Sequence, residues 1–213
     1  MSPHYQDDAI IIHKVKCGPY DNNAYILVCP ETNESIVIDA PEGPDGLIAA
    51  VGATTVRSVL ITHNHSDHIQ GLTEVTSALG APVGISQGDA SALPRPPDFF
   101  LQDGESVVAG TLALKIISTP GHTPGSTCLS IGNHLFTGDT LFPGGPGRTG
   151  TPADLDRLIL SITGRLLTLA DGVTFYPGHG DDGGLKAAKD EYAFFASKEH
   201  APDLCGDVLW LER

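Results

Sequence analysis

The segment His63-Asn64-His65-Ser66-Asp67-His68 places three imidazole rings and one carboxylate within six residues. The apolar run Val59-Leu60-Ile61-Thr62 before it predicts a short buried strand. After it, apolar residues recur at helical spacing between Ile69 and Leu79, which predicts an amphipathic helix. Side chains that can bind a metal therefore gather where a strand ends and a helix begins, a common location for functional residues in layered α/β proteins. Imidazole and carboxylate together suit zinc, iron or nickel, whereas calcium and magnesium prefer oxygen ligands.

Three further segments share one form, in which an apolar strand ends in a glycine-containing loop that displays one candidate ligand. They are Ile117-Ser118-Thr119-Pro120-Gly121-His122, Leu135-Phe136-Thr137-Gly138-Asp139-Thr140 and Phe175-Tyr176-Pro177-Gly178-His179-Gly180. Glycine permits tight turns and close backbone approach at such positions. With the first cluster, these segments supply more ligands than one tetrahedral ion needs and enough for two. The candidates are His63, His65, Asp67, His68, His122, Asp139 and His179.

Length and composition favour one folded domain over residues 1–213. Hydrophobic residues make up 40% of the 213 residues and charged residues 18%, so the chain can bury a core without disulfides or other staples. No apolar run approaches the roughly 18–20 residues that a membrane span requires. The N-terminal residues lack the basic start and apolar centre of a signal peptide, so we expect a cytoplasmic protein that does not bind membranes.

Charge and cysteine spacing argue against several classes of protein. The chain has 12 basic and 26 acidic residues, a net charge of −14, and no basic stripe, which argues against nucleic acid as a partner. The four cysteines are widely spaced and form no CxxC pair, which predicts reduced thiols and excludes a zinc ribbon. Composition and spacing leave the oligomeric state open.

The order of predicted elements favours two sheets with helices outside them. Strands are predicted at 9–16, 24–28, 35–39, 59–62, 107–108, 112–117, 126–131, 134–137 and 173–176, and helices after Pro44, at 69–79, 152–169 and 183–198. The helix at 152–169 has the clearest signals, because Thr151 can cap it and Pro152 suits its first turn. Two strand-rich halves, each followed by helices, predict two sheets packed face to face.

With its HxHxDH motif followed in order by His122, Asp139 and His179, the chain resembles the metallo-β-lactamase superfamily. Within it, the chain resembles short hydrolases of the glyoxalase II (hydroxyacylglutathione hydrolase) type. This resemblance implies an α+β fold, a four-layer αββα sandwich with the metals at one edge of the two sheets.

The resemblance also implies a role for each ligand. His63, His65 and His122 would hold the first metal ion, Asp67, His68 and His179 the second, and Asp139 would bridge both. Asp39, at the end of its strand, matches the family's early aspartate and would orient a ligand by hydrogen bonding. The other histidines, His4, His13, His134 and His200, match no motif and are expected to be structural or on the surface.

The implied activity is hydrolysis of a small thioester or ester, with a hydroxyacylglutathione-type thioester as the first candidate. A hydroxide shared by two divalent ions, by default zinc with iron or manganese as alternatives, would attack the carbonyl carbon, and Asp67 would orient it and could accept its proton. A thiolate with a pKa near 8.5 departs without a strong general acid, which favours a thioester over an amide.

Departures from the glyoxalase II pattern keep the substrate open. In the loop that follows Asp139, Arg148 matches the family's basic residue and Phe142 could line a pocket, whereas Pro146 replaces a cysteine and Gly150 an aromatic residue. The run Gly147-Arg148-Thr149 is shared with persulfide dioxygenases of the same superfamily, which use one iron ion. A lactonase or a β-lactamase would share the same ligands, although class B lactamases commonly place a cysteine at the position of Asp139.

Overall fold

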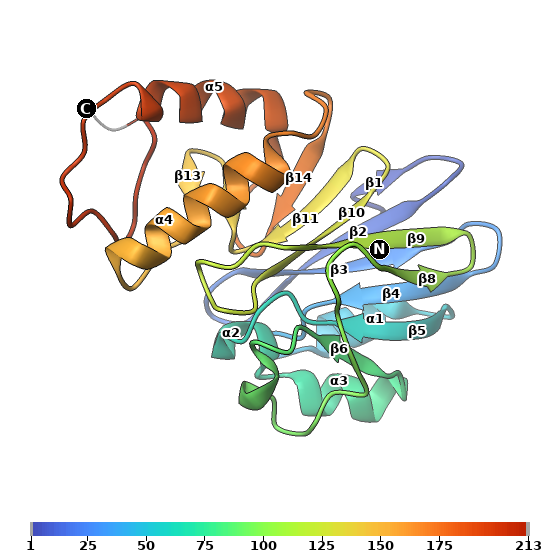
Figure 1. The fold of residues 1–213 in the computed structure, drawn as a ribbon. Helices are drawn as coiled ribbons and strands as arrows, with labels where there is room; N and C mark the ends of the chain where they lie inside the picture. Colours follow the sequence, from blue (N-terminus) through green and yellow to red (C-terminus); the bar gives the residue numbers. More distant parts are fainter. Residues whose placement is uncertain (1, 212–213) are drawn as a thin grey trace.

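Two β-sheets form the centre of the protein, shown in Figure 1 as a computed structural model that describes residues 2–211. The first sheet has seven strands in the order β1-β2-β3-β4-β5-β6-β7. Their bounds are β1 Tyr5–Gln6, β2 Ile11–Cys17, β3 Asn22–Val28, β4 Glu34–Ile38, β5 Thr55–Leu60, β6 Val83–Ile85 and β7 Phe99–Phe100. The pairs from β1 to β4 are antiparallel, and those from β4 to β7 are parallel.

The second sheet has six strands in the order β15-β14-β11-β10-β9-β8. Their bounds are β8 Ser106–Ala109, β9 Leu112–Ser118, β10 Thr127–Ile131, β11 His134–Gly138, β14 Thr174–Pro177 and β15 Gly183–Gly184. Only β11 and β14 pair in parallel. A separate hairpin of β12, Leu141–Phe142, and β13, Gly145–Pro146, follows β11. These two strands, like β1, β7 and β15, were not predicted, because two residues are too few to show a period.

Helices cover the outer face of each sheet, which confirms the four-layer αββα sandwich (Figure 1). The first sheet carries α1, Asp45–Val51, and α3, Leu72–Leu79, and the second carries α4, Pro152–Ser161, and α5, Leu185–Ala196. Short helical segments complete the list: α2 Ser66–Ile69, a 3-10 turn Ala90–Ala92 and a π-helical turn Ile162–Leu166. Among residues 2–211, no helix combines the length and the apolarity that crossing a membrane requires.

Three buried clusters hold these layers together. One lies between the sheets, where Phe136 packs on Tyr25 and Tyr176 with ring centroids 5.1 Å and 5.0 Å apart. The other two lie under the helices, with Leu47 and Val75 on the first sheet and Leu158 and Trp210 on the second. Because both faces of its sheet are covered, β3 is buried at every position and shows no alternation between polar and apolar residues.

Three predicted helices are shorter than the sequence pattern indicated, and the one expected at 183–198 spans Leu185–Ala196 because Gly183 and Gly184 form β15. The helix expected at 69–79 is divided at Gly71, whose N–H donates to the carbonyl of Ala40 at 2.9 Å. A Cβ at Gly71 would lie 2.1 Å from the carbonyl oxygen of Pro41, so the chain passes too close for a continuous helix with side chains. The helix expected at 152–169 begins as predicted at Pro152, capped by Thr151, but the α-helix ends at Ser161 and a π-helical turn around Gly164 follows.

Candidate metal centre

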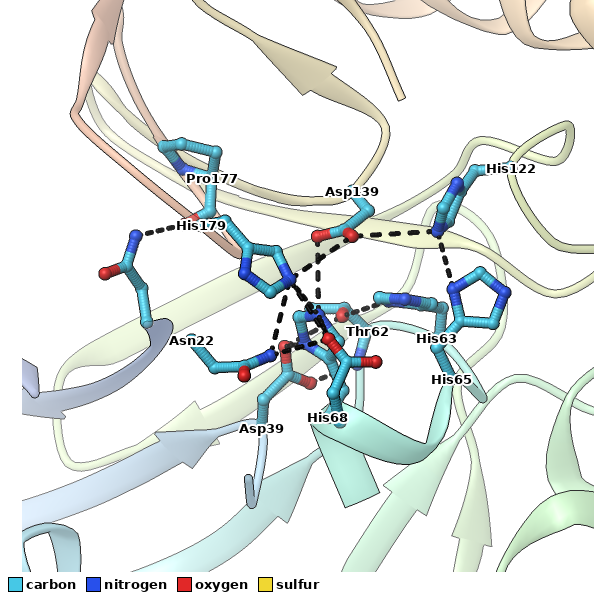
Figure 2. A network of polar contacts seen from close by, with 12 residues as sticks. Asn22, Asp39, Thr62, His63, His65, His68, His122, Asp139, Pro177 and His179 are labelled. Atoms are coloured by element: carbon cyan, nitrogen blue, oxygen red, sulfur yellow. Dashed lines mark hydrogen bonds and ion pairs between the residues drawn. The ribbon is translucent and has the colours of Figure 1, made fainter. Parts of the chain in front are cut away.

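All seven candidate ligands lie at one edge of the sandwich, at the ends of strands from both sheets (Figure 2). His63 and His65 follow β5, and Asp67 and His68 lie on α2. The remaining three come from the second sheet, where His122 lies between β9 and β10, Asp139 follows β11 and His179 follows β14. Residues up to 116 positions apart in the sequence thus meet because their strands end at the same edge.

Three groups of three candidates could each hold an ion; two of them share no residue, and the third, His63, His68 and Asp139, connects these two. His63, His65 and His122 offer ligand atoms that lie within 4.8 Å of one another, and so do Asp67, His68 and His179. In the first group, His122 Nε2 lies 2.9 Å from His65 Nδ1. In the second, His179 Nε2 lies 3.2 Å from His68 Nε2 and 3.1 Å from Asp67 Oδ2. These are the two triads that the resemblance assigned to two ions.

Asp139 lies between the triads. Its Oδ2 is 3.7 Å from His122 Nε2 and 3.6 Å from His179 Nε2, and its Oδ1 is 3.4 Å from His68 Nε2. A Cβ at Gly178 would lie 2.3 Å from Asp139 Oδ1 and 2.5 Å from His68 Cε1. Glycine at position 178 therefore leaves the space that the Asp139 carboxylate occupies. Asp139, between the two triads, is placed where a bridging ligand would be.

Hydrogen bonds on the far side of each ring fix which nitrogen faces the cluster. The carbonyl oxygens of Arg148 and Tyr20 can only accept, so they receive the Nδ1–H of His122 at 2.7 Å and of His179 at 3.0 Å. The Nδ1–H of His68 donates to Asp39 Oδ2 at 2.9 Å. Each of these rings therefore directs its Nε2 to the cluster, and in the neutral ring this nitrogen is the one free to bind a metal, the arrangement typical of metal-binding histidines.

His63 is oriented through a hydroxyl group. Thr62 Oγ1 donates its one proton to Asp39 Oδ2 at 2.9 Å and therefore accepts from the Nδ1–H of His63 at 3.0 Å. Asp39 also accepts a hydrogen bond from the backbone N–H of Thr62 at 2.8 Å. The backbone of Asp39 has a positive φ of 62°, a conformation that aspartate tolerates better than most residues. This geometry agrees with the orienting role predicted for Asp39, which acts on His68 directly and on His63 through Thr62.

Two buried atoms of the cluster have no hydrogen-bond partner among the described residues. They are His63 Nε2 and Asp139 Oδ1, and both belong to the candidate ligand set. A buried polar atom without a partner costs free energy, so such atoms are rare unless a ligand satisfies them. Five imidazoles and two carboxylates with these lone pairs converging fit divalent metal ions, and the cluster is of the kind that binds them.

Burial and mutual contacts shift the pKa values of the cluster. Burial holds the pKa of His63 well below its ordinary value and lowers that of His122, so both rings favour the neutral form that binds metal. The hydrogen bond from His179 lowers the pKa of Asp67, and that of Asp139 is lowered by His68 against the opposing effect of burial. Against its own burial, His68 has its pKa raised well above 6.5 by Asp39 and Asp139.

Sequence reasoning did not identify Asn22, which begins β3 and donates from Nδ2 to Asp67 Oδ2 at 2.9 Å. Its neighbour Asn23 donates from Nδ2 to the carbonyls of Pro177 at 3.0 Å and Gly180 at 2.9 Å. These two hydrogen bonds hold the loop that carries His179 against β3. Asparagine at the start of a strand is ordinarily a turn residue, and only the contact between the two sheets gives this pair its role.

The two residues predicted to bind substrate lie on the loop after Asp139. Arg148 contributes its carbonyl to His122, while its guanidinium is exposed and lies 3.5 Å from the Asp207 carboxylate. Phe142 is half-buried in β12. A substrate-binding role for either side chain stays a prediction. The unmatched histidines lie outside the two triads, with His134 buried against the Tyr176 hydroxyl at 2.8 Å.

Comparison with known proteins agrees with this architecture. Residues 17–179 match the family described as the metallo-beta-lactamase superfamily. The chain belongs to this superfamily. Among curated relatives it is 39% identical over 161 residues to a hydroxyacylglutathione hydrolase of Anaeromyxobacter dehalogenans. That alignment covers 75% of this chain and 61% of the relative, so the chain spans about three fifths of the relative's length.

Solved structures similar to this one carry different functional names. ETHE1 from Myxococcus xanthus is 28% identical with a TM-score of 0.77, over 89% of this chain and 86% of that one. The BLEG-1 B3 metallo-beta-lactamase is 26% identical with a TM-score of 0.75, over 84% of this chain and 96% of that one. The fold is therefore shared by proteins with different functional names, and fold similarity alone does not identify the reaction.

Proposed function

We propose that this protein is a hydrolase with two divalent metal ions that cleaves small acyl thioesters or esters. The observation that carries the proposal is the convergence of seven ligands into two triads with Asp139 between them. A one-metal site needs only three of these side chains. The identity to a hydroxyacylglutathione hydrolase supports a thioester as substrate.

Zinc is the first candidate for both ions, because imidazole nitrogen dominates the donor set. His63, His65 and His122 would hold one ion, and Asp67, His68 and His179 the other. Iron or manganese also suits such mixed nitrogen and oxygen ligands. When bound, these ions would supply an acidified water and polarise the substrate carbonyl.

The chain's own residues would hold and move the protons of the reaction. Asp67, kept ionised by its bonds to His179 and Asn22, would orient the attacking water and accept its proton. Attack on the carbonyl carbon forms a C–O bond, and collapse of the tetrahedral species breaks the C–S bond. The products are a carboxylic acid and a thiolate, which leaves without strong general acid help because its pKa is about 8.5.

The experiment that tests this proposal is the initial rate of S-D-lactoylglutathione hydrolysis by zinc-loaded protein. We expect Asp67→Ala to lower the rate by at least about 100-fold, the lower range for loss of a positioned proton acceptor. Asp156→Ala, at an exposed position of α4, is the matched control and should keep the wild-type rate. No turnover by protein that holds two ions would refute the glutathione thioester and direct the search to lactones and other acyl thioesters.

A persulfide dioxygenase with one iron ion is the alternative that Gly147-Arg148-Thr149 favours. Metal content separates the two proposals, because the dioxygenase reading requires one iron per chain and oxygen uptake with a persulfide. A protein with two ions per chain and no oxygen uptake would exclude it. We expect a small molecule as the substrate and a cytoplasmic location.

A further inference from the structure

We propose that Asp89 is a positioning residue that selectively sets the affinity of the His63, His65 and His122 triad for its metal ion. This inference rests on the proposed two-metal function. Asp89 lies in the loop between β6 and the turn Ala90–Ala92, and its side chain is fully buried. No feature of the sequence singled it out, and it is none of the seven ligands.

The Asp89 carboxylate joins two loops that are distant in the sequence. Its Oδ2 accepts the backbone N–H of Asn64 at 3.1 Å and the hydroxyl of Thr123 at 2.6 Å. Its Oδ1 accepts the backbone N–H of Gly125 at 2.8 Å. One buried side chain thus binds a loop that follows β5 in the first sheet and a loop that precedes β10 in the second.

Those two loops carry the three histidines of the first triad and no other ligand group. Asn64 stands between His63 and His65, and Thr123 directly follows His122. The separation between the His63–His65 loop and the His122 loop therefore depends on Asp89. The relevant distance is the 2.9 Å between His65 Nδ1 and His122 Nε2.

The packing around Asp89 leaves little freedom to the two loops. A Cβ at Gly125 would lie 2.6 Å from Asp89 Cγ and 2.3 Å from Ser86 Oγ, and a Cβ at Gly88 would lie 3.0 Å from the Cα of Gly125. The segment Ser86–Asp89 thus contacts the His122 loop backbone to backbone. Such contact transmits a displacement at Asp89 to the neighbouring histidines, because packed backbone cannot absorb it.

The second triad is held by a different carboxylate. Asp39 accepts from His68 Nδ1 directly and reaches the first triad only at His63, through Thr62. Asn22 contacts Asp67 and lies 3.3 Å from His179 Nε2, and neither Asp39 nor Asn22 contacts Asp89. A substitution of Asp89 should therefore weaken the binding of one ion and leave the binding of the other unchanged. A general loss of stability would not produce this pattern.

Asp89→Asn is the variant that tests the inference. The amide keeps the shape of the carboxylate, but in either orientation its NH2 group faces the backbone N–H of Asn64 or of Gly125. Removing the hydrogen-bond partner of a ligand side chain typically weakens metal affinity by about 10- to 100-fold. Asp89 acts through residues next to the ligands, so we take the lower end, about 10-fold. We expect that loss for one of the two zinc ions and an unchanged affinity for the other.

The measurement is zinc bound per chain across a series of buffered free-zinc concentrations, with the Co²⁺ absorption spectrum as a second readout. Asp89→Asn should resemble His122→Ala in stoichiometry and spectrum, and should differ from His179→Ala. Asp7→Asn is the matched control, because Asp7 also accepts two backbone N–H groups and one hydroxyl, from Ala9, Ile10 and Tyr5. It should bind both ions as the wild type does.

If Asp89→Asn does not fold, Thr123→Val removes the hydroxyl that donates to Asp89 at 2.6 Å, together with its 2.7 Å contact to Ser126 Oγ in the same loop. This variant should weaken the binding of the same ion to a smaller extent. Wild-type affinity for both ions in a folded variant, or equal loss of both, would overturn the inference. A wild type that binds a single ion would refute the two-metal function instead. The role of Asp89 would then be decided by whether its substitution weakens that ion.

Discussion

Gly121→Ala tests whether the loop that carries His122 is fixed by direct packing on α4. Gly121 has a φ of +146°, a region that is essentially limited to glycine. A Cβ there would lie 2.4 Å from the Cα and 2.5 Å from the backbone nitrogen of Leu158, whereas nonbonded carbon atoms prefer about 3.5–4.0 Å. The loop or the helix must therefore move by about 1 Å or more.

Two costs add in this substitution. The backbone conformation costs about 1–3 kcal/mol for a residue other than glycine, and overpacking against a helix backbone costs about 1–3 kcal/mol. Together we expect Gly121→Ala to lower the free energy of unfolding by roughly 2–6 kcal/mol. Displacement of His122 should also weaken metal binding in any fraction that folds.

Equilibrium unfolding in urea, followed by circular dichroism on metal-free protein, measures this free energy. Two alanine substitutions separate the costs. Gly132 has a positive φ of +54° and open space around it, so Gly132→Ala should lose only about 1–2 kcal/mol. Gly164 lies in the π-helical turn, and no atom lies within 4 Å of the position of an added Cβ, so Gly164→Ala should raise the free energy of unfolding by up to about 1 kcal/mol. A loss for Gly121→Ala no larger than that for Gly132→Ala would refute the packing argument.

Three further predictions concern stability. Phe136→Ala should cost about 3–5 kcal/mol in urea unfolding, because it empties the space between the sheets; a cost as small as that of Phe194→Ala, at a site 40% exposed, would contradict this. Thr151→Ala should cost about 1 kcal/mol, since Thr151 accepts the N–H of Asp154 at 3.2 Å as the cap of α4, and an unchanged midpoint would exclude a capping role. Removing metal with a chelator should lower the Tm by roughly 8–16 °C. A free metal concentration about 1,000 times the Kd stabilises the folded protein by about 4 kcal/mol, and that stabilisation is lost with the metal. An unchanged Tm would argue against resident ions.

Local pattern alone predicted most of the elements and all seven candidate ligands. The run His63–His68 is informative without any tertiary knowledge, because its ligand types lie within one strand end and one helix start. The αββα layers followed from the family resemblance, and the helices on the outer face of each sheet confirm them. The boundaries of the elements were predicted less accurately. At Gly71, for example, the helix is divided by a close contact with Pro41, which lies 30 positions away in the sequence.

Residues that act on the ligands from outside the motif could not be found in the same way. Asp89, Asn22 and the carbonyl of Tyr20 each have a role only because a loop from another part of the chain lies beside them. An aspartate or asparagine in a loop reads in the sequence as a turn or cap residue, whatever its partner. The carbonyl of Tyr20 gives no sequence signal at all, because every residue has one.

The sequence by itself determined the donor set, the order of strands and helices and the acidic charge, because these depend on residue type and short-range spacing. The family resemblance implied the two triads and the place of Asp139, but only the tertiary structure gave the distances between the donors and decided which nitrogen of four of the rings faces the cluster. Those features depend on which strand ends are neighbours in space, and on hydrogen-bond partners such as Asp39 and Thr62 that lie 23 residues apart and meet across the ends of β4 and β5.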